Sequence, residues 1–133
     1  RNEREVESVS TYNAALRQAS QAYGGAQVST APQKKLILML YDGAIQNLMS
    51  AQRALEIKDL QTAHQKILKG QLIIEELMVT LNFEAGGDIA QNLYKLYEYF
   101  HWSLVQANIK KDKDQVAGVQ QYLEELRESW HQL

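Results

Sequence analysis

The sequence predicts an all-α protein, an antiparallel up-and-down four-helix bundle preceded by an additional amino-terminal helical or extended segment. Apolar residues recur every three or four positions through four long stretches, and no stretch shows the alternation of a strand. Both glycine pairs fall where this periodicity breaks. With 133 residues, of which 45% are hydrophobic, the chain can build one domain with a core. We expect an amino-terminal leader over residues 1–31 and the bundle over residues 32–133.

The leader carries a thin apolar stripe from Val6 to Tyr23, at spacings of three and four, and Gly24-Gly25 ends it. Short helices in water depend on packing. We therefore expect this segment to be ordered only where it docks on the bundle.

The first long helix is predicted over residues 32–58, because Thr30 offers a cap and Pro32 suits a first turn. Residues 36–41 are all apolar or aromatic, so they point nearly all the way round a helix. We assign Ile37, Leu40 and Ala44 to the core, Leu38 and Ile45 to the outside, and Tyr41 to the margin between them. Gly43 allows a close approach by a neighbouring helix or a client.

The second helix is predicted over residues 60–81 with Asp59 as its cap. Leu68, Leu72 and Val79 lie off its core stripe and make a second apolar face. Gly70 lies on the core stripe, where it marks either close helix contact or simple tolerance, at about 1 kcal/mol relative to alanine.

Two more helices complete the bundle. The third is predicted over residues 88–110, after a connection at residues 82–87 and with Asp88 as its cap. Its core stripe includes Leu93, Tyr97 and Phe100, and a second apolar group on the far side comprises Tyr94, Trp102, Val105 and Ile109. The fourth helix, from Lys113 to the end, is apolar on one side only.

Three of the four helices thus carry more apolar surface than a small bundle can enclose. A helix that is apolar on several sides is either buried or binds a partner. Every helix of a four-helix bundle is peripheral, so the pattern favours binding. The alternative is a structural bundle that uses the same faces to form a homo-oligomer.

Several classes of function are disfavoured. A net charge of -2 gives no electrostatic reason to expect nucleic acid. No run approaches the roughly 18 to 20 apolar residues that span a bilayer, and the amino end lacks a secretory signal, so we expect a cytoplasmic protein without membrane insertion. There is no cysteine to act as nucleophile or zinc ligand.

The sharpest enzymatic pattern is Glu98-x-x-His101, with a second copy at Glu128-x-x-His131. Such pairs hold two metal ions in ferritin-like bundles, together with a glutamate from each remaining helix. Here Glu98 lies opposite a core stripe, and His131 is close to the chain end. We expect solvated side chains, no metal or other cofactor, and no enzymatic activity, and we expect His64 to be a surface or capping residue.

A series of short motifs carries a family resemblance. The motifs are Tyr23, residues 28–31, 36–44 and 86–90, Asn92-Leu93, Leu96-Tyr97, residues 104–108, Arg127-Glu128 and Trp130. In this order and spacing the chain resembles the FliS family of flagellar secretion chaperones. The resemblance implies a cytoplasmic bundle that binds the disordered carboxyl-terminal segment of flagellin in apolar surface grooves. It also implies that binding prevents premature polymerisation and keeps the client competent for flagellar type III secretion.

The resemblance and the surplus faces together predict a binding surface. We expect it to comprise Tyr23 and Val28 of the leader and, in the bundle, Leu38, Tyr41, Ile45, Leu72, Tyr94, Tyr97, Trp102 and Val105. An export-gate component is a further expected partner, and the free protein is expected to be a monomer. The chain departs from the family where Pro32 replaces a capping hydroxyl, which can shift the helix start by a residue. We also expect the leader to fold back into the client's groove.

Overall fold

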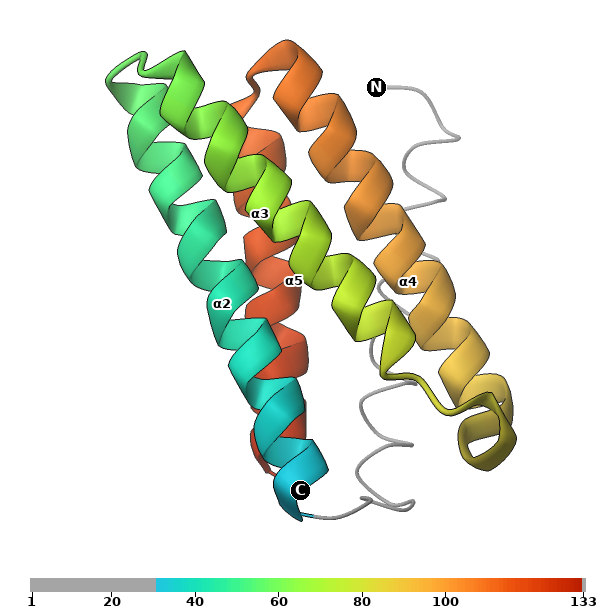
Figure 1. Ribbon diagram of the computed structural model, residues 1–133. Coiled ribbons are helices and arrows are strands. Elements are labelled where there is room, and N and C mark those ends of the chain that lie inside the picture. The colour runs from blue at the N-terminus through green and yellow to red at the C-terminus, as the bar shows by residue number, and fades with distance from the viewer. Residues whose placement is uncertain (1–30, 133) are drawn as a thin grey trace.

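The computed structural model describes residues 31–132, which form four helices and no strand. The helices are α2 (Ala31–Glu56), α3 (Leu60–Val79), α4 (Phe83–Lys110) and α5 (Lys113–His131). Successive helices run antiparallel, and each packs against two others, because α2 and α4 both lie between α3 and α5 (Figure 1). The predicted all-α four-helix bundle is confirmed, whereas the expected leader lies outside the described residues.

Polar side chains define the starts of α3 and α5. Asp59 Oδ1 accepts a hydrogen bond of 3.2 Å from the Thr62 amide, as predicted for a cap. Asp112 Oδ1 accepts bonds from the amides of Asp114 and Gln115, at 3.0 and 3.2 Å. These carboxylates satisfy amides at the helix starts that have no partner within the helix. Asp59 and Asp112 thus determine where α3 and α5 begin.

The connection between α3 and α4 differs from the prediction. Residues 83–86 form a helical turn instead of a loop, because Asn82 Oδ1 accepts from the Ala85 amide at 3.0 Å and the Asn82 carbonyl accepts from the Gly86 amide at 2.8 Å. The break comes at Gly87, where φ is 49° and ψ is -124°. The structure thus caps α4 at Asn82 and not at Asp88, and the long straight part of α4 begins after the glycine.

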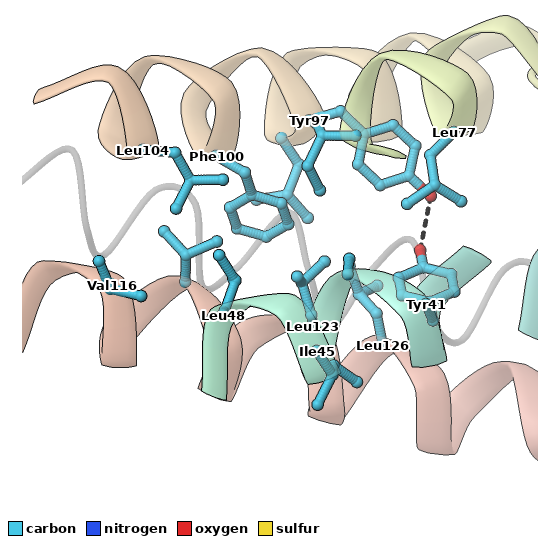
Figure 2. Packing of buried hydrophobic residues seen from close by; sticks show 14 of the residues in the cluster. Tyr41, Ile45, Leu48, Leu77, Tyr97, Phe100, Leu104, Val116, Leu123 and Leu126 are labelled. Atoms are coloured by element: carbon cyan, nitrogen blue, oxygen red, sulfur yellow. Dashed lines mark hydrogen bonds between the residues drawn. The ribbon is translucent and has the colours of Figure 1, made fainter. Parts of the chain in front are cut away.

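The core includes two tyrosines whose hydroxyl groups lie 2.5 Å apart, Tyr41 on α2 and Tyr97 on α4 (Figure 2). Both are essentially fully buried and lie among the aliphatic side chains of the bundle interior. A buried hydroxyl is stabilised only when it is hydrogen-bonded, and each tyrosine supplies a partner for the other. The pair connects two helices that are diagonal across the bundle.

Two glycines allow α3 to approach α2 closely. A Cβ atom at Gly70 would lie 2.8 Å from Leu48 Cδ2, which is closer than real Cβ atoms come to other atoms. A Cβ atom at Gly43 would lie 3.3 Å from Ile73 Cδ1. Of the two interpretations left open for Gly70, the structure supports close helix contact over simple tolerance, and Gly43 lies in the same α2–α3 contact.

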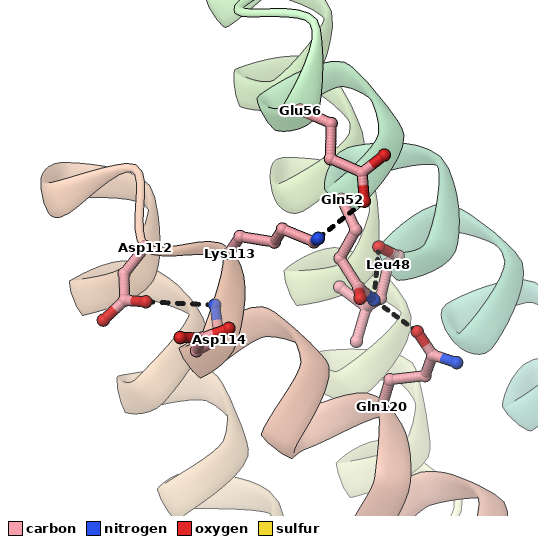
Figure 3. Close-up of polar contacts among 7 residues, drawn as sticks. All are labelled: Leu48, Gln52, Glu56, Asp112, Lys113, Asp114 and Gln120. Atoms are coloured by element: carbon pink, nitrogen blue, oxygen red, sulfur yellow. Dashed lines mark hydrogen bonds and ion pairs between the residues drawn. The ribbon is translucent and has the colours of Figure 1, made fainter.

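Polar contacts fix the register of α5 against α2. Lys113 Nζ lies 2.6 Å from Glu56 Oε1, and Gln52 pairs with Gln120 further along the two helices (Figure 3). The hydrogen bond and charge of Lys113 hold the pKa of Glu56 below its ordinary value, and the same contact raises the pKa of Lys113. These contacts place α5 along one side of α2.

Candidate functional site

An apolar surface remains uncovered where the outer sides of α3 and α4 meet. Leu72 of α3 is 60% exposed and Trp102 of α4 is 56% exposed, although both are large apolar side chains. Other exposed apolar residues on the two helices are Leu68, Val79, Tyr94 and Ile109, and Val105 is half-buried. We call these seven residues the α3–α4 face.

Two contacts across the helices show that these residues share one side of the bundle. His101 Nε2 lies 3.1 Å from Glu75 Oε2, and Asn108 Nδ2 lies 2.9 Å from His64 Nδ1. Leu68 and Leu72 lie between the two contact points along α3, and Trp102 and Val105 lie between them along α4. At 3.6 residues per turn Leu68, Leu72 and Val105 project outward close to this line of contact, and Trp102, one residue after His101, projects outward about 100° round α4 from it.

Aromatic contacts position the rings of α4. The Tyr94 ring meets the Phe83 ring edge to face, with 5.9 Å between the centroids. Trp102 stacks against Tyr99 at 6.2 Å, one turn away on the outer side of the helix. Rings held by other rings lose little further freedom when a ligand covers them. The face therefore offers preformed apolar contacts.

The polar groups of this face are mostly acidic. Glu75 of α3 and Glu98 of α4 are exposed beside it, and His101 lies between them. Lys95 of α4 is exposed and lies seven residues before Trp102, so it points to nearly the same side of the helix. The face is therefore apolar, with charged groups of both signs at its margin.

Four of the predicted site residues come together on this face, namely Leu72, Tyr94, Trp102 and Val105. Their assignment to an outer side is confirmed by their exposure. Whether a client touches them stays a prediction.

On α2, the outward assignment of Ile45 and the assignment of Tyr41 to the margin are wrong, and Tyr97 of α4 is also inaccessible. Ile45 is 8% exposed because α5 covers that side of α2, as the nearby pair of Asp42 with Arg127 shows. Tyr41 is 0% exposed, since its polar tip meets the Tyr97 hydroxyl and not water.

The remaining predicted residues lie elsewhere. Leu38 is half-buried against the core on the α5 side of α2, away from the α3–α4 face. Tyr23 and Val28 lie outside the described residues.

Four apolar residues of this region were not among the predicted binding residues. Leu68, Val79 and Ile109 are exposed in the same seam, and their positions on the second apolar sides of their helices could have identified them. Phe83 was missed because residues 82–87 were predicted to be a connection. The signal in the sequence is Asn82 directly before Phe83, because asparagine is favoured at helix caps, and in the structure its Oδ1 accepts from the Ala85 amide.

The two Glu-x-x-His pairs do not converge. His101 faces Glu75, and Glu128 accepts a hydrogen bond of 3.2 Å from Gln132. Across residues 31–132, no three histidine, aspartate or glutamate side chains are grouped so that they could hold a metal ion. Nor is any helix of this part of the chain long and apolar enough to cross a bilayer.

The described residues thus form an all-α four-helix bundle with an exposed apolar face on α3 and α4. The sequence profile of a family described as "Flagellar protein FliS" matches residues 15–133. The chain belongs to this FliS family of flagellar secretion chaperones, which is a family of chaperones and not of enzymes.

Its relatives include three proteins with matching names. The chain is 36% identical to the "Flagellar secretion chaperone FliS" of Bacillus subtilis over 111 residues, which are 84% of this chain and 82% of the relative. It is 36% identical to the protein of that name from Salmonella typhimurium over 107 residues, 80% and 79% of the two chains. It is 35% identical to "Flagellar secretion chaperone FliSB" of Pseudomonas aeruginosa over 116 residues, 87% and 92% of the two chains.

Proposed function

We propose that this protein is a cytoplasmic export chaperone for flagellin. It binds the disordered carboxyl-terminal segment of flagellin, prevents premature polymerisation and keeps the client competent for flagellar type III secretion. Membership of the FliS family supports the chaperone role and implies a secreted client. The observation that carries the binding site is the exposed α3–α4 face.

The recognition mode is an amphipathic client helix lying along this face. From Tyr94 to Ile109 the face follows fifteen residue steps of α4, which at 1.5 Å each is about 22 Å. A client helix of about fifteen residues matches that length. Its apolar side would cover Leu72, Trp102 and Val105, which are otherwise in contact with water.

The energetics favour tight but releasable binding. A segment that folds along a bundle can remove on the order of 1,000 to 3,000 Å² from water, while ordering the segment opposes binding by several kcal/mol. Delivery to the export apparatus requires release, so an export-gate component is a second proposed partner. In this proposal Tyr23 and Val28 of the leader extend the binding surface, and Leu38 adds a separate contact on α2.

The test is calorimetric titration of the full chain with a peptide covering the carboxyl-terminal segment of flagellin from the same organism, followed in parallel by circular dichroism. We expect saturable binding with a gain of helical signal beyond the sum of the two components. A flat titration would contradict the proposal, and a scrambled peptide of the same composition is the control.

The second candidate function is a structural bundle that forms a homo-oligomer through the same face. The exposed apolar residues fit this function equally well before a client is considered. Light scattering of the free protein separates the two. A monomer agrees with a chaperone whose face awaits a client, and a dimer whose mass does not change with concentration favours the structural bundle.

A further inference from the structure

Each helix of the α3–α4 face carries one glutamate next to its exposed apolar residues. On α3, Glu75 follows Leu72 by three residues and precedes Val79 by four. On α4, Glu98 follows Tyr94 by four residues. Residues three or four apart share one side of a helix. Each helix therefore presents a carboxylate beside the apolar residues that a client would cover.

The two carboxylates lie at nearly the same level of the bundle. His101 Nε2 is 3.1 Å from Glu75 Oε2, so these two residues face each other across α3 and α4. Glu98 is one turn before His101, about 4.5 Å along α4. Lys95 points about 60° farther away from α3 than Glu98 does, on the Trp102 side of the helix. Glu75 and Glu98 therefore lie on the two sides of the line where α3 meets α4.

Both carboxylates are in contact with water in the free protein. The Glu75 side chain is 53% exposed, and Glu98 is exposed as well. A client helix on the face removes this water, and a helix that is apolar throughout would not replace the hydrogen bonds that are lost. A carboxylate that loses its water is stabilised by a cation that also donates hydrogen bonds to it. A client with a basic side chain at this level therefore binds more tightly than one without it.

We infer that the α3–α4 face selects a client helix with a lysine or arginine between two apolar turns, and that this basic side chain pairs with Glu75 and Glu98. The inference rests on the proposed function and specifies the chemistry of the client. From Leu72 to Glu75 and from Glu75 to Val79, the three and four residue steps correspond to about 4.5 and 6 Å. The contacting side of the client thus carries an apolar residue one turn before the basic residue and another one turn after it. Arginine suits this position best, because its guanidinium has five donors in a planar group.

The test is calorimetric titration of the full chain with the carboxyl-terminal flagellin peptide. At about pH 7 and about 150 mM salt, charges more than about 8 Å apart are largely screened. The double variant Glu75→Gln with Glu98→Gln keeps the size of both side chains and removes their charges. We expect it to bind the peptide about tenfold more weakly, since close charge pairs across an interface are coupled by at least about this factor.

The matched control is the double variant Glu76→Gln with Glu125→Gln. It changes the net charge by the same amount, and both residues are exposed on α3 and α5 outside the face. This variant should bind the peptide like the unmodified protein. An equal loss in both double variants would overturn the inference, because it would indicate an effect of net charge alone.

A scan of the peptide assigns the partner of the two carboxylates. Each lysine and arginine of the peptide is replaced in turn by glutamine, and one replacement should weaken binding to the unmodified protein about tenfold. The same replacement should cause no further loss with the Glu75→Gln, Glu98→Gln variant, because the pair is already absent.

Unchanged affinity of the Glu75→Gln, Glu98→Gln variant would overturn the inference and leave the proposed function standing. So would a peptide scan in which every replacement has the same effect on both proteins. Thermal melts of the variants check that the bundle is intact. Absence of binding by the unmodified protein would overturn both the proposed function and this inference.

Discussion

Replacement by alanine should have opposite effects on the free energy of unfolding at Gly70, on the inner side of α3, and at Gly118 of α5. Gly118→Ala on α5 adds a methyl group with no atom within 4 Å. Alanine is favoured over glycine in a helix interior by about 1 kcal/mol, so this variant should be more stable by about that amount. Gly70→Ala gains the same helix preference, but its methyl group meets Leu48 Cδ2 at 2.8 Å.

Leu48 is fully buried, so it has little room to move away from a new methyl group at Gly70. Overpacking of a core costs about 1 to 3 kcal/mol, which leaves Gly70→Ala neutral to destabilised by about 2 kcal/mol. Urea unfolding of the two variants should thus differ by about 1 to 3 kcal/mol, or roughly 3 to 10 °C in melting temperature. Equal stabilisation by both substitutions would refute the close packing of α3 on α2.

Three further predictions concern polar groups. Tyr97→Phe removes the buried hydrogen bond to Tyr41. We expect the free energy of unfolding, measured in urea, to fall by about 1 kcal/mol. An unchanged unfolding midpoint would count against that hydrogen bond. Asp112→Ala removes the cap of α5 and should lower the free energy of unfolding by about 1 kcal/mol, again measured in urea. An unchanged free energy of unfolding would show that the cap does not stabilise the bundle. Lys113→Gln should raise the pKa of Glu56 toward its ordinary value in an NMR titration, because the lysine is what lowers it. A Glu56 pKa that does not move would show that the pair is absent in solution.

The amphipathic helices were the most predictable part of the fold. Residues 113–131 carry one apolar stripe, and Val116, Leu123 and Leu126 on that stripe are all buried. The second sides of α3 and α4 were also predictable, because Leu72 and Trp102 lie well away from the core stripes of their own helices. The spacing of apolar residues is enough to predict which residues are buried where a helix buries a single narrow stripe.

Periodicity did not suffice for α2. The buried side of α2 is wider than the predicted stripe, because Ile45 and Tyr41 are buried together with Ala44, between α3 at Gly43 and α5 at Asp42. No residue near Ile45 in the sequence indicates that α5 covers it. The pairing of Tyr41 with Tyr97 joins residues far apart in the chain, and only the packed bundle defines it.

The connection between α3 and α4 was predicted to be a loop over residues 82–87, and this prediction failed for another reason. The glycine pair at residues 86–87 indicated a break, and a break does occur at Gly87. The preceding residues still form a helical turn, because Asn82 caps them and Phe83 contacts the Tyr94 ring. The ring contact depends on the tertiary fold.

The central claim is that the α3–α4 face receives the client, and a matched pair of lysine substitutions tests it most directly. Leu72 on this face and Met39 on the outer side of α2 are both 60% exposed and have similar helix propensities. Leu72→Lys should weaken binding of the carboxyl-terminal flagellin peptide at least tenfold, since burying a leucine contributes about 1.5 to 3 kcal/mol. Met39→Lys should bind like the unmodified protein, with both variants melting as before. Normal binding by Leu72→Lys, or an equal loss in both variants, would contradict the claim.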